Sequence, residues 1–229
     1  CMKNMPEFDD VENFPSEKDN LKEFQVHQWK GLFFVGGNKY FSSVIDELER
    51  RIGWLKLEKF THDESRHRDY EIKANWALYI DNYLEGFHIP FVHGDLHEIL
   101  DYDSYKTELF EGGVLQIGIA NEGEECFDLP DSSPDYGENI AAYYYWIFPG
   151  LMLNFYPWGL SVNIVNPISV DKTQIIYQGF VGNENLLGKG AGGNLDKVEL
   201  EDQDIVEATQ RGVSSTSYER GRYSPSKEM

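Results

Sequence analysis

The sequence predicts an α+β fold in which helices flank one antiparallel sheet. Between residues 113 and 182, short runs rich in aromatic and β-branched residues are separated by Gly, Pro, Asn or Asp, which is typical of an antiparallel meander. The runs are GGVLQIGIA, YYYWIFP, LMLNFYPW, LSVNIVNP and TQIIYQGFVG. A flexible loop is expected at 185–194 and a final helix over roughly 195–216. Because the strands follow one another without intervening helices, they predict an α+β plan.

The residues before the sheet predict a loop, a strand-like run and a short helix. Residues 1–22 are polar and acidic, as expected of a loop, and 24–37 forms a strand-like run that ends in two glycines. A helix is expected over 42–53, where Ser43 would cap the first turn and Gly53 would end the last. Helical structure is therefore predicted on both sides of the sheet.

The composition allows a substantial core and carries a strong acidic excess. Of the 229 residues, 41% are hydrophobic, and 40 acidic residues outnumber 20 basic ones, giving a formal net charge of −20. Binding to nucleic acid or to an anionic membrane requires clustered Lys and Arg, so neither partner is expected. No apolar run is long enough to span a membrane, and no signal-peptide pattern opens the chain.

Cysteine usage restricts the kinds of site that the chain can form. Two cysteines, Cys1 and Cys126, are too few for a disulfide framework or for a metal site built from several thiolates. Their scarcity indicates a reducing, intracellular compartment, and we expect the cytoplasm. The abrupt start at Cys1 indicates an internal point of a longer protein.

The stretch DNYLEGFHIPFVH, residues 81–93, crowds two carboxylates and two histidines together. They are Asp81, Glu85, His88 and His93. The preceding segment begins strand-like at residue 68 and becomes helical near residue 74, and a helix that continues to His88 would place both carboxylates on its face. Like charges four residues apart repel, so a proton, an imidazolium or a cation would have to offset them.

Pro90 makes a pair of metal ligands possible in this stretch. The ring interrupts a regular helix, so that His93 can turn back toward His88. The pattern predicts either half of a metal site or, alternatively, histidines at a helix end that are paired with carboxylates.

Asp202 is the candidate for a third ligand. On a helix with 100° per residue it lies at the centre of an apolar stripe, whereas the other acids of the helix are predicted to form a solvated face, with Glu201 at the edge. The stripe consists of Val198, Ile205, Val206, Thr209 and Val213. A carboxylate in a buried stripe is costly unless it is protonated, paired or bound to a metal. Two histidines and one carboxylate form the facial triad of a non-haem Fe(II) oxygenase, and the lack of cysteine ligands disfavours structural zinc.

Three segments resemble the catalytic domain of Rieske non-haem iron oxygenases, the family of the ring-hydroxylating dioxygenase large subunits. NWALYIDNYLEGFHIPFVH (75–93) resembles its iron-binding signature, and EDQDIVEATQRGVSS with YERGRYSP (201–225) resembles the segment with the third ligand. WIFPGLMLNFYPWGLSVNIVNP (146–167) resembles the sheet between them. Glu at position 85 and the run TQRGVSSTSYERGRYS (209–224) are similar to the branch of choline and carnitine monooxygenases.

The resemblance implies a fold and a set of site residues. The fold would be a helix-grip (Bet v 1-like) domain, an antiparallel sheet wrapped around a long C-terminal helix. His88, His93 and Asp202 would bind a mononuclear Fe(II). Glu85 would be the acidic residue that connects the iron site to the Rieske cluster of a neighbouring subunit, and Asn82 the asparagine near the iron.

The chain also departs from the family pattern. The Cys-x-His and Cys-x-x-His motifs of the [2Fe–2S] Rieske cluster are absent, so the cluster is expected in the full-length protein and not in this chain. Residues 1–36 are expected to be the C-terminal end of a Rieske domain, and 37–229 a catalytic domain truncated at its C-terminus. This chain alone is therefore not expected to catalyse the reaction.

The implied enzyme is an oxygenase that activates dioxygen at Fe(II) to hydroxylate an aromatic compound or a quaternary ammonium or alkylamine compound. Its implied partners are an NAD(P)H-dependent reductase or a ferredoxin, and a homotrimer is expected. Aromatic residues of the meander could line the substrate pocket, although they are better explained as core: Tyr143, Tyr144, Tyr145, Trp146, Phe148, Phe155 and Trp158. The alternative is a non-catalytic helix-grip domain that binds a small molecule, which would have no use for an inward-facing Asp202.

Overall fold

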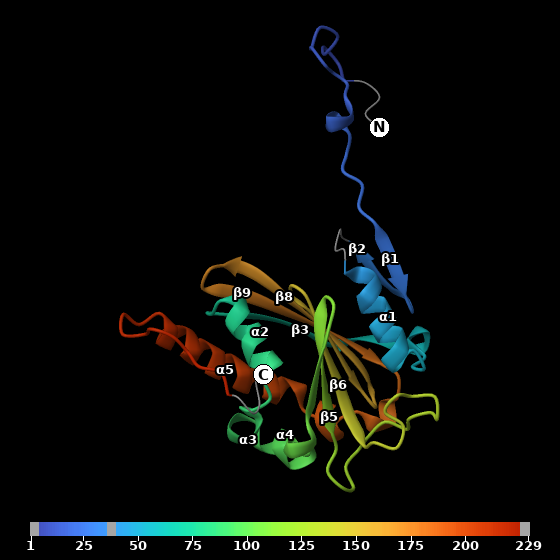
Figure 1. Cartoon of the computed structure of the whole chain (residues 1–229), viewed down its shortest axis with the longest axis vertical. Coiled ribbons are helices and arrows are strands. Elements are labelled where there is room, and N and C mark those ends of the chain that lie inside the picture. The colour runs from blue at the N-terminus through green and yellow to red at the C-terminus, as the bar shows by residue number, and fades with distance from the viewer. Residues whose placement is uncertain (1–4, 36–39, 225–229) are drawn as a thin grey trace. The chain divides into compact units, whose positions relative to one another are not determined.

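The computed structural model describes residues 5–35 and 40–224. Contacts within the chain divide it into two units, residues 1–39 and residues 40–229 (Figure 1). In the described part of the chain, no helix has both the length and the hydrophobicity needed to cross a membrane.

The first unit contains a short 3-10 helix and a β-hairpin. Ser16 caps the 3-10 helix Glu17–Asp19 through a capping box. The strands β1 (Val26–Trp29) and β2 (Leu32–Val35) pair antiparallel. Lys30 and Gly31 between them both have positive φ, at 45° and 88°, as two-residue hairpin turns require. The strand-like run predicted over 24–37 is therefore a hairpin; its two terminal glycines lie outside the described residues.

The second unit is built on a seven-stranded antiparallel sheet with the order β3-β9-β8-β7-β6-β5-β4. The strands are β3 (Thr61–Ile72), β4 (Lys106–Phe110), β5 (Gly113–Ile119), β6 (Ile140–Ile147), β7 (Leu151–Tyr156), β8 (Gly159–Ser169) and β9 (Lys172–Val181). The five predicted runs are β5 to β9, so the meander is confirmed. The strand-like segment predicted from residue 68 is the end of β3. The rest of β3 and all of β4 were not predicted, because β3 is rich in charged residues and β4 is short and mostly exposed, as is common at sheet edges.

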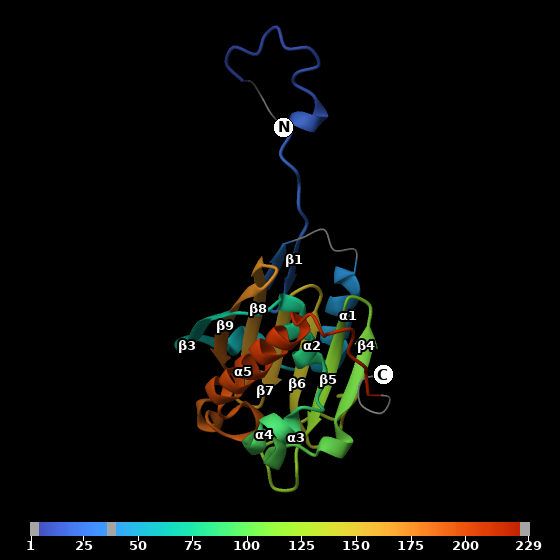
Figure 2. The same cartoon turned by 90° about the vertical axis from the view of Figure 1, so that its left-hand side faces the viewer.

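Helices cover both faces of this sheet. They are α1 (Phe41–Ile52), α2 (Trp76–Leu84), α3 (Ile89–Val92), α4 (Gly94–Ile99) and α5 (Leu195–Val213). Helices α2 and α5 lie side by side across one face, and α1 lies on the other (Figures 1 and 2). Tyr79, Met152 and Val206 belong to the core between α2, α5 and the sheet. The predicted α+β class and helix-grip plan are confirmed.

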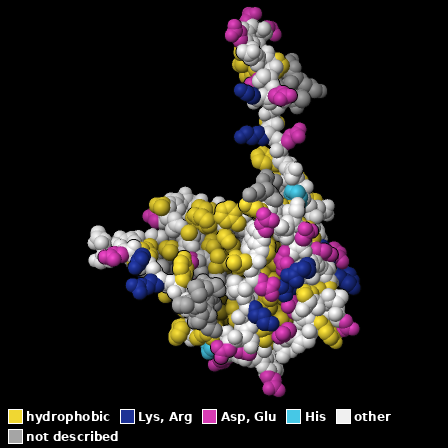
Figure 3. Space-filling model, viewed as in Figure 1, with side chains coloured by type: hydrophobic (Ala, Val, Ile, Leu, Met, Phe, Trp, Pro, Cys, Tyr) yellow, Lys and Arg dark blue, Asp and Glu magenta, His cyan; other side chains and the backbone are white. Residues whose placement is uncertain are grey.

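Hydrophobic side chains also gather on the surface over α2 and the adjoining ends of β8 and β9 (Figure 3). Ile168 and Val170, at the turn between these strands, are 51% and 79% exposed. An apolar surface of this kind is typical of a region that contacts another protein.

Three predicted helix boundaries differ from the structure. Ser43 does not cap α1, which begins after Tyr40; its hydroxyl donates to Glu111 instead, whereas Gly53 does end the helix. The last helix ends at Val213 rather than near residue 216. Helix α2 ends at Leu84 and does not reach His88.

The backbone at Glu85 is extended, with φ −112° and ψ 139°. Its carboxylate accepts hydrogen bonds from the backbone N–H groups of Phe87 and His88, which competes with helical hydrogen bonding. The chain then starts a new short helix, α3, with Pro90 in its first turn. The expectation of a single helix through residue 88 is therefore wrong, and His88 belongs to a separate turn.

Candidate metal centre and its pocket

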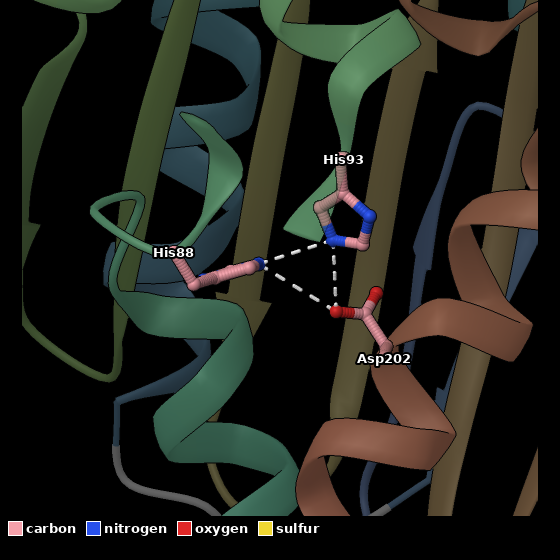
Figure 4. A group of neighbouring side chains, drawn as sticks. All are labelled: His88, His93 and Asp202. Carbon is pink, nitrogen blue, oxygen red and sulfur yellow. Dashed lines mark hydrogen bonds and ion pairs between the residues drawn. The ribbon is translucent and has the colours of Figure 1, made fainter. Parts of the chain in front are cut away.

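His88, His93 and Asp202 point toward one another from three separate places in the chain (Figure 4). His88 precedes α3, His93 lies between α3 and α4, and Asp202 lies in the middle of α5. The Nε2 atoms of the two histidines are 3.2 Å apart, and Asp202 Oδ1 lies 3.0 Å from Nε2 of His93 and 3.5 Å from Nε2 of His88. The three side chains that the sequence singled out as metal ligands therefore meet at one point.

Each imidazole is held by a second carboxylate on its other nitrogen. Nδ1 of His88 lies 2.6 Å from Oε1 of Glu85, and Nδ1 of His93 lies 2.8 Å from Oε2 of Glu201. An ionised carboxylate can only accept, so each Nδ1 carries a proton and Nε2 is the nitrogen that each imidazole can offer to a metal. Carboxylate–histidine pairs of this kind commonly orient metal-binding histidines.

Asn82 and Asp81 behave differently from each other, although they are neighbours on α2. Nδ2 of Asn82 donates to Oδ1 of Asp202 at 2.7 Å, so Asn82 fixes the carboxylate of the triad. Asp81, which the sequence analysis grouped with the cluster, is exposed and lines a hollow at the surface. The helix that would have aligned Asp81 with His88 ends too early to do so.

The electrostatics of the three groups are strongly coupled. Burial by itself lowers the pKa of His88, but hydrogen bonds to Asp202 and Glu85 outweigh it and raise this pKa to about 9. Burial likewise raises the pKa of Asp202, while hydrogen bonds from His88 and His93 lower it, with a net downward shift. The two Nε2 atoms and Oδ1 of Asp202 lie close together, and their lone pairs repel one another unless protons or a cation lie between them. Two imidazoles and one carboxylate, without a thiolate, are a donor set that suits Fe(II) and similar divalent metals.

A cavity of about 100 Å³ opens beside the triad, and we call it the triad cavity. A bound water needs roughly 10–15 Å³ of such volume, so the cavity has room for about seven to ten water-sized atoms. Six of its lining residues are tyrosines: Tyr79, Tyr83, Tyr105, Tyr144, Tyr156 and Tyr177. Gln116, Asn154, Ser161 and Asn163 line it from the sheet. Among the described residues that line the cavity there is no lysine or arginine.

Most aromatic residues that the sequence offered as pocket candidates lie elsewhere. Tyr144 lines the triad cavity, but its neighbours Tyr143 and Tyr145 point to the opposite face of the sheet and are fully buried. Phe155 is also core, Phe148 is 54% exposed, and Trp158 lines a second cavity. The explanation of these residues as mostly core is confirmed. The six tyrosines of the cavity come from five segments, because Tyr79 and Tyr83 both lie on α2.

Glu199 is a buried carboxylate that the sequence analysis missed. Its side chain is 3% exposed, and the hydroxyl groups of Tyr79 and Tyr177 both donate to Oε2, the first at 2.7 Å. Burial raises the pKa of Glu199 to about 7. The expectation that all other acids of α5 face solvent is wrong here, because on a helical wheel Glu199 lies about 60° from Asp202, beside the buried Val206. Thr209 and Ile205, by contrast, are exposed although the wheel placed them in the stripe.

Comparisons with known proteins identify the family. The model of the ring hydroxylating alpha subunit family (catalytic domain) matches residues 57–229. A chloroplastic choline monooxygenase of Arabidopsis thaliana is 33% identical over 164 residues, which is 68% of this chain and 37% of that protein. The carnitine monooxygenase oxygenase subunit of Escherichia coli K12 is 26% identical over 219 residues, which is 92% of this chain and 57% of that protein. The chain spans between 36% and 58% of the length of the curated relatives that it matches.

Solved structures show the same fold at low sequence identity. The quaternary ammonium Rieske monooxygenase CntA in complex with L-carnitine matches with a TM-score of 0.63 at 21% identity, over 94% of this chain and 58% of that chain. A naphthalene 1,2-dioxygenase from Rhodococcus sp. matches with a TM-score of 0.61 at 17% identity, over 93% and 60%. Together with the family match over most of its length, these likenesses show that the chain belongs to the ring hydroxylating alpha subunit family and carries its catalytic domain.

Proposed function

We propose that this chain is the mononuclear iron domain of a Rieske-type oxygenase that hydroxylates a quaternary ammonium compound. The observation that carries the proposal is the convergence of His88, His93 and Asp202, with each imidazole held by its own carboxylate. A domain that only binds a small molecule gains nothing from a carboxylate turned toward two histidines. The alternative of a non-catalytic helix-grip domain is therefore not favoured.

In this proposal His88, His93 and Asp202 hold Fe(II), which supplies the activation of dioxygen for hydroxylation when it is bound. The remaining groups orient the ligands. Glu85 and Glu201 keep the proton on each Nδ1, so that both Nε2 atoms stay free for the metal. Asn82 fixes the rotation of the Asp202 carboxylate. The tyrosines of the triad cavity exclude bulk water and shape the space in which the substrate lies.

We also propose that Glu85 connects this centre to the Rieske cluster of a neighbouring subunit. Glu85 lines both the triad cavity and the hollow at the surface, and its side chain is 14% exposed. It therefore reaches from His88 to the outside of the unit. Inter-subunit electron transfer is named in the description of a CntA structure.

For the complete protein, we propose the electron source, location and assembly that the family resemblance implies. Electrons would come from NAD(P)H through a reductase or a ferredoxin to a [2Fe–2S] Rieske cluster outside this chain, in a cytoplasmic homotrimer. Residues 1–36 would correspond to the end of the Rieske domain. The apolar surface over α2, β8 and β9 supports an assembly with other subunits (Figure 3).

A quaternary ammonium compound fits the triad cavity better than an aromatic hydrocarbon does. The described lining combines tyrosines, amides and the carboxylates of Glu85, Glu199 and Asp202, with no basic residue. Such a lining favours a cation, which tyrosine rings also attract through their π faces. Choline and carnitine monooxygenases among the relatives support the same class of substrate.

Metal analysis of the purified chain tests the proposed function. After anaerobic incubation with Fe(II) and desalting, we expect one iron per chain for the wild type and less than about a tenth of that for Asp202→Ala. Asp204→Ala removes an exposed acid of the same helix and should retain full iron. Full iron retention by Asp202→Ala, or no iron in the wild type, would contradict the proposal.

A further inference from the structure

Glu199 is a buried carboxylate that accepts hydrogen bonds from neutral groups. The hydroxyl groups of Tyr79 and Tyr177 and the amide of Gln203, which donates to Oε1 at 3.1 Å, all donate to its carboxylate. In the part of the chain that the structure describes, it makes no ion pair. Placing a carboxylate in a protein interior is costly unless it is protonated or a cation neutralises it. The site therefore has a missing partner, which is either a proton or a cationic ligand.

Glu199 faces the space in which the substrate is proposed to lie. It lines the triad cavity together with both of its tyrosine partners, which come from α2 and β9. It also precedes Asp202 by three residues on α5, which corresponds to about 4.5 Å along the helix axis. If Glu199 holds the cationic nitrogen of the substrate, the substrate carbon atoms a few bonds from that nitrogen would lie near the three metal-binding side chains.

The hydrogen bonds of Glu199 match a cation that has no N–H group. A quaternary ammonium group cannot donate a hydrogen bond, so it cannot satisfy the acceptor atoms of a buried carboxylate. Tyr79 and Tyr177 already donate to Oε2 and Gln203 to Oε1, so the carboxylate lacks positive charge and not hydrogen bonds. The rings of the same tyrosines can in addition present π faces to the cation.

Two basic residues that share a cavity with Glu199 have other partners. Arg66 and Arg68 line the second cavity, which also includes Glu199. Arg68 pairs with Asp196 at 2.7 Å. Arg66 pairs with Asp63 at 3.4 Å, and its guanidinium lies over the ring of Trp158, 5.1 Å from the centroid. Neither arginine therefore neutralises Glu199.

We propose that Glu199, with its hydroxyl donors Tyr79 and Tyr177, is the subsite that holds the cationic head group of the substrate. This inference rests on the proposed function and adds to it the residue that determines the charge of the substrate. The pKa of Glu199, which burial raises to about 7 in the absence of a ligand, supports the same assignment.

Calorimetric titration of the iron-loaded chain under anaerobic conditions tests this subsite with two ligands of equal shape. Choline carries the quaternary nitrogen, and in 3,3-dimethylbutan-1-ol a neutral carbon replaces it. We expect the wild type to bind choline at least about tenfold more tightly than the neutral alcohol. In Glu199→Gln the Kd for choline should rise about tenfold or more, while the Kd for the alcohol changes less than about twofold.

Two further variants separate charge from shape. Glu199→Asp keeps the charge and should retain a preference for choline over the alcohol. Asp204→Asn removes an exposed charge from the same helix and should bind both ligands like the wild type. An equal loss for both ligands in Glu199→Gln, or an unchanged preference for choline, would overturn the subsite. If the wild type bound iron but showed no preference for choline, the cationic substrate would fail together with the subsite, while the metal centre would stand.

Discussion

In the metal-free chain, Glu199→Gln should remove the loss of stability that the ionisation of Glu199 causes as the pH rises. Burial raises the pKa of this carboxyl from an ordinary value of 4.5 to about 7, so the folded protein favours its neutral form. The unfolded chain ionises near 4.5 and the folded chain only near 7. Between these values folding requires proton uptake, and the stability that the neutral carboxyl contributes is lost as the pH rises.

The size of this effect follows from the two pKa values. The interval from 4.5 to about 7 corresponds to about 3 kcal/mol in the free energy of unfolding. The contribution is fully present below pH 4.5 and absent above about pH 7. A glutamine has nearly the same shape and does not titrate, so the variant should gain about 3 kcal/mol relative to the wild type over this range.

Urea unfolding at several pH values between 4.5 and 8, with a chelator present, measures this difference directly. All other titrating groups are common to both proteins and cancel in the comparison. Asp204→Asn, which changes an exposed acid of the same helix, is the matched control and should change the free energy of unfolding by less than about 1 kcal/mol. Two parallel stability curves for the wild type and Glu199→Gln would refute the argument that Glu199 is a buried, neutral carboxyl.

Three further predictions concern the metal centre and the opposite face of the sheet. The pKa of His88 is raised to about 9, and a histidine must lose its Nε2 proton before that nitrogen can bind a metal. The affinity for Co(II) should therefore increase as the pH rises from 6.5 to 8.5, and binding should release protons. A Kd that does not change over this range would argue against the raised pKa. Glu201→Gln should weaken Co(II) binding about 10- to 100-fold in the same titration, because the Nδ1 proton of His93 loses its negatively charged acceptor. An unchanged Kd would mean that the charge of Glu201 does not support the ligand. Arg51→Ala should lower the free energy of unfolding, measured in urea, by about 3–5 kcal/mol, because it leaves Asp135 buried without its ion pair. Arg50 is half exposed, so Arg50→Ala should cost less than about 1 kcal/mol. Similar losses for both variants would contradict this account.

The sequence by itself was enough to find the strands β5 to β9 and the three residues of the triad. Each strand carries its own local signal, since aromatic and β-branched residues recur between turn-forming residues. His88 and His93 are close in the chain, and Asp202 stands out as a charge in the middle of an apolar helical stripe. Such features depend on neighbours within one or two turns, so they can be recognised without a structure.

The local sequence pattern did not predict the structure correctly where competing hydrogen bonds end a helix or where a strand lies at the edge of the sheet. The pattern around residue 85 continues a helix, but the Glu85 side chain bonds the following backbone N–H groups and ends α2 four residues early. Strand β3 is charged because it lies at the edge of the sheet, and the edge position itself is a consequence of its pairing with β9, the last strand of the chain.

Tertiary structure alone decided which acidic residues of α5 have a role. Glu199, Glu201 and Asp204 all look like solvated acids in the sequence, and they differ because of what lies opposite each one. Tyr79 on α2 and Tyr177 on β9 enclose Glu199, His93 meets Glu201, and solvent surrounds Asp204. These partners lie up to 120 residues away, and no pattern within a single helix records which distant side chain will face it.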